Sequence, residues 1–317
     1  MNDNRELVYV AGHRGLAGSA IARAIEKRGK QEWIGRTRAE LDLTNRDAVF
    51  EFMKETKPDA VVVAAAKVGG IGANDAFPVE FLTENLQIQS NLLDAAHEVA
   101  VPHLLFLGSS CIYPKFADQP IHESSLLTGP LEPTNDAYAI AKIAGIRLVD
   151  AYRSQYGHHW ISAMPTNLYG IGDNFDLESS HVLPALIRRF HEAAESGVAN
   201  VTLWGSGVAL REFLYVDDLA DACLFLLENY DESGPINVGF GEEISVRDLA
   251  TKIAEVVGYR GTISWDGLHP DGTPRKLLDS SRIRAAGWAP SVGLAEGIQL
   301  TFEWFKATQT PSAGPAN

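Results

Sequence analysis

Short apolar runs alternate with longer amphipathic stretches through the first half of the chain. Continuous apolar runs are typical of parallel strands that helices cover on both faces, and the stretches between them repeat apolar residues at helical spacing. The runs lie at residues 7–10, 32–35, 60–65, 103–107 and 160–164. The pattern therefore predicts an α/β fold with a doubly wound parallel sheet of the Rossmann type.

Two of the predicted helices are long. Residues 79–98 and 137–155 each carry leucine, isoleucine or alanine on one broad face, which is wide enough to pack on the sheet or on a second subunit. A shorter helix follows residues 32–35, and Thr44 is the candidate for its amino-terminal cap.

The first strand ends in a glycine-rich turn that leads into a helix. Gly12, Gly15 and Gly18 form a GxxGxxG run, in which glycine lets the backbone turn tightly and approach a pyrophosphate at the helix amino terminus. An enzyme that uses NAD places Asp or Glu at the end of the second strand, but here the residues are Arg36 and Arg38. These arginines, with Arg14 inside the loop, favour the 2′-phosphate of NADP(H).

The alternation loosens beyond about residue 170, which indicates a second, smaller α/β lobe that binds substrate. We expect an NADP-binding Rossmann domain over residues 1–169, rejoined by about 215–245 through a helix near 217–229 and a strand at 236–238. Residues 170–317 would form mainly the substrate-binding lobe, ending in a disordered tail over about 307–317 because these last residues are small, polar and rich in proline.

Composition and charge exclude several classes of protein. The 27 basic residues against 41 acidic residues give a formal charge of −14, which repels phosphate backbones and argues against nucleic acid as a partner. No apolar stretch is long enough to span a membrane, and the amino terminus lacks the apolar core of a signal peptide. With two cysteines and scattered histidines, we expect a cytoplasmic protein without disulfides or a metal site.

A catalytic pattern follows the fourth predicted strand. Ser109 stands at the tip of that strand, and Tyr138 and Lys142 lie four residues apart at the start of a helix, hence on one face. A nearby ammonium favours the tyrosine phenolate, so the phenol could donate and recover a proton, while the serine hydroxyl could hold a substrate carbonyl. In this pattern the sequence resembles the extended short-chain dehydrogenase/reductases, and Lys142 also suits the nicotinamide ribose.

Cys111 stands two residues after Ser109 and can reach the same pocket. A thiolate there could remove a proton from a carbon next to a polarised ketone, although a free cysteine is mostly protonated at neutral pH unless a cation helps. A buried, inert thiol is the alternative.

Longer stretches narrow the resemblance to the GDP-L-fucose synthase family. Similar segments cover the chain from about residue 7 to about residue 306. They read GHRGLAGSA, AAAKVGGI, GSSCIYP, LEPTNDAYAIAKIAG, PTNLYG, SHVLPALIRRFHEA, LWGSG, REFLYVDD and DGTPRKLLD.

This resemblance implies NADPH-dependent conversion of GDP-4-keto-6-deoxy-D-mannose to GDP-L-fucose, by epimerisation at C3 and C5 and then reduction at C4. It assigns Cys111 as the base and His181 as the acid. It also implies a homodimer, with residues 79–98 and 137–155 as interface candidates. The residues implied to hold the diphosphate, sugar or guanine, or to line the same cleft, are Asn167, Arg189, Trp204, Arg211 and Lys276.

Two alternatives stay open. A related enzyme could act on another GDP-4-keto-deoxy sugar, as a colitose synthase does, because one hydroxyl on the sugar can be read by a single side chain. A protein of another class, a non-catalytic NADP-sensing regulator, would be expected to lose the tyrosine and lysine pair, which this chain keeps as Tyr138 and Lys142.

Overall fold

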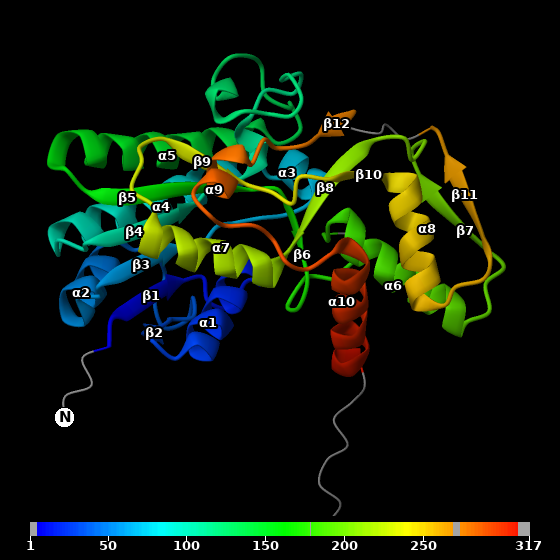
Figure 1. Cartoon of the computed structure of the whole chain (residues 1–317), viewed down its shortest axis with the longest axis horizontal. Helices are drawn as coiled ribbons and strands as arrows, with labels where there is room; N and C mark the ends of the chain where they lie inside the picture. Colours follow the sequence, from blue (N-terminus) through cyan, green and yellow to red (C-terminus); the bar gives the residue numbers. More distant parts are fainter. Residues whose placement is uncertain (1–4, 178, 269–272, 310–317) are drawn as a thin grey trace, which may run out of the picture.

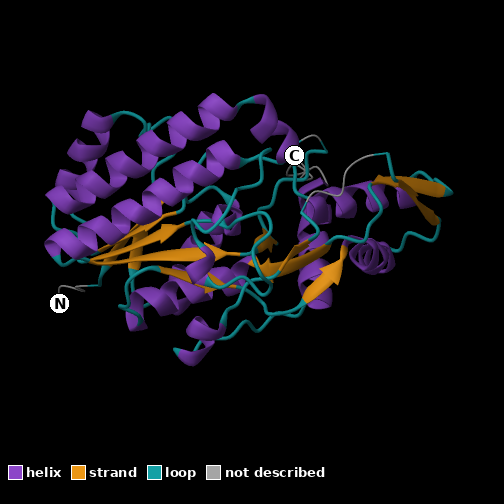
Figure 2. Ribbon diagram, turned by 90° about the horizontal axis from the view of Figure 1, so that it is seen from above, coloured by secondary structure: helices purple, strands orange, loops and turns teal. Residues whose placement is uncertain are grey.

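A computed structural model describes residues 5–177, 179–268 and 273–309. Its larger part is a parallel sheet in the order β2-β1-β3-β4-β5-β9 (Figures 1 and 2). The strands are β1 (Leu7–Ala11), β2 (Glu32–Ile34), β3 (Ala60–Val63), β4 (His103–Leu107), β5 (His159–Pro165) and β9 (Pro235–Val238). From β1 the chain builds the sheet outward in both directions, which confirms the predicted doubly wound fold class.

Helices cover both faces of this sheet. On one face lie α2 (Arg46–Thr56), α4 (Pro78–Glu98) and α5 (Asp136–Tyr156), and on the other lie α1 (Leu16–Arg28) and α7 (Val216–Asn229). Alternate residues of β1 serve the two layers: Val8 and Val10 pack with α1 and α7, whereas Tyr9 and Ala11 pack with α2 and α4. The strands are buried on both faces, and their sequences are therefore apolar without alternation.

The amino-terminal cap of α2 corrects the prediction made from the sequence. Asn45, not Thr44, caps the helix, because the Asn45 side chain accepts a hydrogen bond from the Ala48 amide nitrogen. Thr44 instead donates its hydroxyl proton to Asp42 over 2.8 Å. Both residues are good caps, and the turn at Asp42 decides between them.

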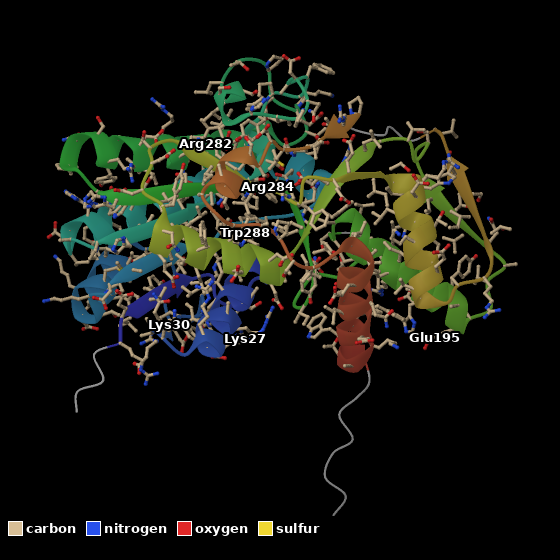
Figure 3. All side chains as sticks on the ribbon, in the orientation of Figure 1. Lys27, Lys30, Glu195, Arg282, Arg284 and Trp288 are labelled. Atoms are coloured by element: carbon tan, nitrogen blue, oxygen red, sulfur yellow. The ribbon has the colours of Figure 1, made fainter. Side chains whose placement is uncertain are left out.

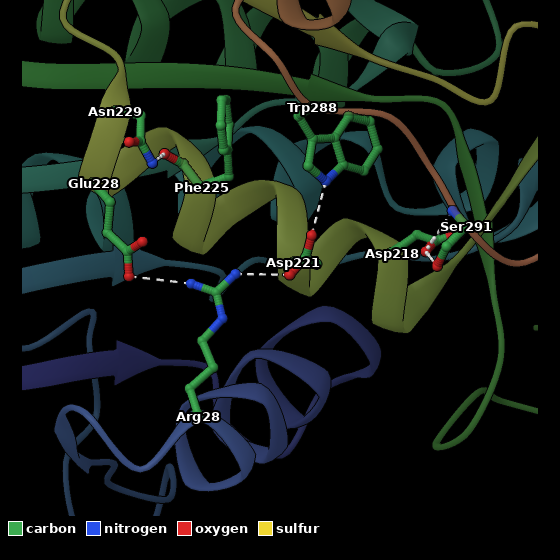
Figure 4. Close-up of polar contacts among 8 residues, drawn as sticks. All are labelled: Arg28, Asp218, Asp221, Phe225, Glu228, Asn229, Trp288 and Ser291. Atoms are coloured by element: carbon green, nitrogen blue, oxygen red, sulfur yellow. Dashed lines mark hydrogen bonds and ion pairs between the residues drawn. The ribbon is translucent and has the colours of Figure 1, made fainter.

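Segments late in the sequence return to the larger body. Arg28 of α1 donates to Asp221 of α7 over 2.7 Å, and the Trp288 indole donates to the same carboxylate over 3.0 Å. Figure 4 shows both contacts. Arg282, in the short helix α9 (Ser281–Ala285), donates over 2.9 Å to the Pro235 carbonyl of β9. Arg282 is one of the residues labelled in Figure 3.

The smaller lobe begins where β5 ends. β6 (Asn167–Tyr169) pairs with β8 (Leu210–Tyr215), which also pairs with β10 (Glu243–Ser245) and β12 (Arg275–Lys276). A second small sheet and three helices complete the lobe, and they are β7 (Asn200–Trp204), β11 (Thr262–Asp266), α6 (Val182–Glu195), α8 (Val246–Val257) and α10 (Leu294–Gln309). The lobe therefore stands at the carboxyl ends of the parallel strands, where open α/β sheets bind ligands.

The carboxyl terminus differs in part from the prediction. Residues 307–309, which were predicted to belong to a disordered tail, form the last turn of α10, whereas residues 310–317 lie outside the described residues.

The remaining elements of the described chain are α3 (Ile71–Ala76), η1 (Ser110–Ile112) and η2 (Glu123–Ser125). Over the described ranges, no helix combines the length and the apolar character needed to cross a bilayer.

Candidate active site

The glycine loop lies between β1 and α1, at the carboxyl edge of the sheet. Gly12 has a φ of +86°, and a Cβ atom added there would lie 2.7 Å from the Ala65 backbone nitrogen. A Cβ atom at Gly18 would overlap the Gly12 carbonyl oxygen. α1 begins after Gly15 and has no acidic residue in its first turn. This close backbone packing and the unopposed positive end of the helix fit the pyrophosphate of a dinucleotide.

Three arginines lie near this loop and the end of β2. Arg14, Arg36 and Arg38 are all exposed. Burial and then the charge of Arg14 lower the pKa of His13, with Arg36 acting in the same direction, so both arginines lie close to that ring. Arg38 forms a 3.7 Å ion pair with Glu84 and keeps 76% of its side-chain surface in solvent. Contact of these guanidinium groups with the 2′-phosphate of NADP(H) stays a prediction.

Ser109 and Cys111 lie on one tight turn after β4. Ser109 caps η1, and its hydroxyl oxygen accepts a hydrogen bond of 3.2 Å from the Cys111 amide nitrogen. Cys111 is half-buried, whereas Cys223, the other cysteine, lies in the core. The turn therefore presents one hydroxyl and one thiol together at the carboxyl end of the strand.

The start of α5 brings Tyr138 to the same turn. Burial, and then the charge of Cys111, raise the pKa of Tyr138 above that of a free phenol, while a hydrogen bond with Ser109 opposes the rise. This differs from the expectation that Lys142 would lower that pKa. The phenol consequently holds its proton at neutral pH, which is the form needed to protonate an alkoxide.

Lys142 lies one helical turn further along α5 and is buried. Its Nζ atom donates a 2.8 Å hydrogen bond to the Leu107 carbonyl oxygen and lies 4.8 Å from the centre of the Phe106 ring. Burial lowers the pKa of Lys142 to about 8. The ammonium is thus fixed to the end of β4 beside the Ser109 turn, and its contact with a nicotinamide ribose stays a prediction.

The Cys111 thiol is more acidic than its burial alone would make it. Burial raises the pKa, but the charge of Lys276 and hydrogen bonds from Ser109, Lys276 and Asn135 outweigh it, and the pKa lies below that of a free cysteine. The Lys276 Nζ atom lies 3.5 Å from the sulfur. A base of this kind suits the removal of a proton from carbon.

His181 stands at the amino-terminal end of α6, on the smaller lobe. The residue is exposed to solvent, and partial desolvation, followed by the charge of Lys276, lowers its pKa. Lys276 thus acts on both His181 and Cys111. The charge of one lysine therefore influences both groups to which the resemblance gave the roles of acid and base.

The residues predicted to hold substrate are placed in different ways. The Arg189 guanidinium lies 6.0 Å from the centre of the Trp204 ring, which is 67% exposed. Arg211 stands next to Lys276 in the pairing of β8 with β12. Asn167 donates to the Glu212 carbonyl oxygen over 2.7 Å and so helps to tie β6 to β8. Direct contacts of these side chains with a substrate stay predictions.

Two neighbours of the site were missed from the sequence. Asn135, the residue before α5, helps to lower the pKa of the Cys111 thiol, and no described residue hydrogen-bonds to its buried Oδ1 atom. Glu212 is fully buried and accepts hydrogen bonds from the Gly241 and Leu278 amide nitrogens. The sequence offered one indication for each residue. Asn135 stands three residues before Tyr138, and Glu212 directly follows Arg211, which was predicted to bind substrate.

Over the described part of the chain, no three His, Cys, Asp or Glu side chains gather as they would around a metal ion.

The glycine loop, the Ser109, Tyr138 and Lys142 side chains and the carboxyl-edge location together define a dinucleotide-dependent reductase of the short-chain type. The chain belongs to the NAD dependent epimerase/dehydratase family, whose model matches residues 8–239.

Similar proteins indicate which enzymes of this family the chain resembles. The chain is 56% identical to GDP-L-fucose synthase 1 of Arabidopsis thaliana over 96% of this chain and 94% of that protein. It is 50% identical to the GDP-L-fucose synthase of Escherichia coli (strain K12), over 96% and 98% of the two chains. Identity to the GDP-L-colitose synthase of Yersinia pseudotuberculosis is 39%, over 94% and 97%. The resemblance found in the sequence is thereby confirmed.

Solved structures agree with this placement. A GDP-6-OMe-4-keto-L-xylo-heptose reductase from Campylobacter jejuni superposes with a TM-score of 0.91 at 34% identity, over 97% of this chain and 99% of that one. A GDP-L-fucose synthetase from Naegleria fowleri bound to NADP superposes with a TM-score of 0.88 at 28% identity, over 96% and 94%.

Proposed function

We propose that this protein converts GDP-4-keto-6-deoxy-D-mannose to GDP-L-fucose, by inverting C3 and C5 and then reducing C4 with NADPH. The observation that carries the proposal is the Cys111 thiol, which is acidified beside Ser109 and Tyr138. Keto reduction needs the hydroxyl groups but no thiolate, whereas a thiolate beside a ketone can remove protons from the flanking carbons.

Epimerisation starts at the carbons that flank the C4 ketone. Cys111 as a thiolate accepts the proton, and the electrons of the broken C–H bond move into the ketone to form an enolate. Ser109 and Tyr138 donate hydrogen bonds to the enolate oxygen and so stabilise the charge. His181, from the smaller lobe, returns a proton to the opposite face of the ring, and the carbon is inverted.

Reduction uses the same hydroxyl groups. NADPH, when bound, supplies the hydride for C4. Tyr138 donates its proton to the C4 oxygen, for which its raised pKa is suitable because the phenol is protonated at neutral pH. Lys142, held by the Leu107 carbonyl, fixes the nicotinamide ribose. Gly12, Gly15 and Gly18 accommodate the pyrophosphate, and Arg14 and Arg38 bind the 2′-phosphate.

The diphosphate of the substrate needs local cations, since the chain as a whole is acidic. Arg189 and Arg211 supply planar guanidinium groups that bind two phosphate oxygens together, and Trp204 packs near the sugar or the guanine. The colitose-type alternative is disfavoured by the lower identity to the Yersinia enzyme. A non-catalytic regulator is disfavoured because the relatives in the comparison are named synthases.

A homodimer is part of the proposal. The long helices α4 and α5 pack side by side, and they leave large apolar residues in solvent, including Val79 at 66% and Ile140 at 48% exposure. A second copy that covers this face would bury them. Sedimentation velocity should show a dimer for the wild type and a monomer for Ile140→Asp, whereas a wild-type monomer would contradict the proposal. A cytoplasmic location stays a prediction from composition.

The activity is tested in heavy water with GDP-4-keto-6-deoxy-D-mannose and NADPH. The expected product is GDP-L-fucose with deuterium at C3 and C5, identified by NMR. Tyr138→Phe should exchange these protons without reduction, and Cys111→Ser should lose the exchange. Reduction by the wild type without deuterium at either carbon would mean a simple ketoreductase, and no reaction would point to another nucleotide sugar.

A further inference from the structure

Lys276 contacts the sulfur atom of Cys111 rather than a carboxylate. Its Nζ atom donates to the sulfur at 3.5 Å, and the side chain is half-buried. Within the ranges that the structure describes, no Asp or Glu oxygen lies at ion-pair distance from this ammonium. A cation that is left without a carboxylate partner and faces a thiol stabilises the thiolate.

The backbone around Lys276 is held on both sides. The Leu277 amide donates to the Gln119 side chain over 2.9 Å, and the Leu277 carbonyl accepts from the Ile121 amide over 2.8 Å. Arg275, the preceding residue on β12, points to the other side of the strand and donates to Glu243 over 2.8 Å. Because successive side chains of a strand alternate, this pairing directs Lys276 toward Cys111.

Glu212 fixes the same segment from the protein interior. Its carboxylate has no exposed surface and accepts hydrogen bonds from the Leu278 amide over 3.1 Å and the Gly241 amide over 2.7 Å. A buried carboxylate is costly unless it is satisfied in this way. Glu212 is therefore a positioning residue that holds the strand carrying Lys276.

We propose that Lys276 is a catalytic residue, which keeps Cys111 ionised for proton abstraction. The inference rests on the proposed function and adds a group to it. In the step, the carbon–hydrogen bond breaks, its proton joins the Cys111 sulfur, and its electron pair passes to the C4 carbonyl oxygen. Lys276 stays protonated throughout and gives up its contact with a charged sulfur when the thiol forms.

The other groups that face the thiol do not replace this cation. From α5 comes the Tyr138 phenol, which is neutral at physiological pH because its pKa is raised. Ser109 and Asn135 contribute neutral hydrogen bonds. Burial and then the charge of Lys276 lower the pKa of His181, so this ring does not supply a second cation beside the thiol.

Alkylation by iodoacetamide tests the ionisation without any sugar. Its rate, followed by mass spectrometry between about pH 6 and about pH 10, reports the thiolate of Cys111, because Cys223 has no exposed surface. Lys276→Met should move the midpoint up by about one pH unit, which is about tenfold less thiolate at neutral pH. Lys276→Arg should restore the midpoint, and Arg275→Met, on the other side of the same strand, should leave it unchanged.

Turnover separates this role from substrate binding. In heavy water, Lys276→Met should slow deuterium exchange at C3 and C5 about tenfold at neutral pH and recover as the pH rises. A raised KM with an unchanged alkylation midpoint would overturn the proposal and assign Lys276 to the diphosphate. If Lys276→Met does not fold, a wild-type midpoint at or above the value of about 8.5 for free cysteine overturns it equally. A wrong sugar would abolish turnover but leave the alkylation profile intact.

Discussion

The Lys142 ammonium donates a 2.8 Å hydrogen bond to the carbonyl oxygen of Leu107, the last residue of β4. This bond joins the catalytic helix α5 to the strand whose carboxyl end carries the Ser109 turn. A buried lysine with one neutral partner favours its uncharged form, and its pKa is accordingly lowered to about 8.

This burial makes stability depend on pH in a defined direction. The folded pKa of about 8 lies below the ordinary lysine value of 10.5, so the unfolded chain binds more protons between these values. The free energy of unfolding should therefore rise with pH through this window, by up to about 3 kcal/mol relative to Lys142→Met, which lacks the group. Urea denaturation of both proteins across that range measures the difference, and a constant difference would contradict the prediction.

Gly18→Ala should weaken cofactor binding. The new Cβ atom would overlap the Gly12 carbonyl oxygen, so α1 must move away from the loop that accommodates the pyrophosphate. We expect at least about a tenfold rise in the Kd for NADPH and a loss of about 1–3 kcal/mol in stability. Gly293→Ala is the control, because among the described residues beyond its two chain neighbours no atom lies within 4 Å of its added Cβ. Fluorescence titration checks the affinities, and equal behaviour of both variants would argue against the proposed loop contact.

Arg38→Ala should reduce the preference for NADPH. Its side chain is 76% exposed and lies beside the end of β2, where it can meet the 2′-phosphate. Loss of one charge-assisted contact should lower kcat/KM for NADPH by about tenfold while changing that for NADH by less than about threefold. Arg46→Ala, which removes an arginine paired with Asp94, is the matched control. A parallel loss with both cofactors would show that Arg38 does not read the phosphate.

Asp221→Ala should destabilise the larger body without changing the chemistry. The carboxylate accepts from Arg28 over 2.7 Å and from the buried Trp288 indole over 3.0 Å, so its removal leaves an indole N–H without its partner. We expect a loss of about 1–2 kcal/mol by chemical denaturation. Glu228→Ala breaks only the Arg28 bond at 3.1 Å and should cost less than about 0.5 kcal/mol. Equal losses would mean that the indole bond contributes nothing.

Whether an element could be predicted from the sequence depends on how that element is stabilised. The fourth predicted strand and β4 share the bounds His103–Leu107, because a parallel strand covered on both faces must be apolar throughout. β12 has two charged residues, Arg275 and Lys276, and no such pattern, so only its partners reveal it. The α2 cap shows the same limit locally, since Thr44 and Asn45 have similar propensities and the turn at Asp42 separates them.

The sequence by itself determined the chemical inventory and the order of the elements: a glycine loop after the first strand, and a serine, a thiol, a tyrosine and a lysine after the fourth. These patterns are local, and periodicity and turn chemistry act over a few residues. The tertiary structure alone decided that Lys276 meets Cys111, 165 residues earlier in the chain, and that Glu212 holds the strand that brings it there. The physical reason is that a long side chain on a short polar strand has no preferred partner until packing of the two lobes sets its position, and with it the charge beside the thiol.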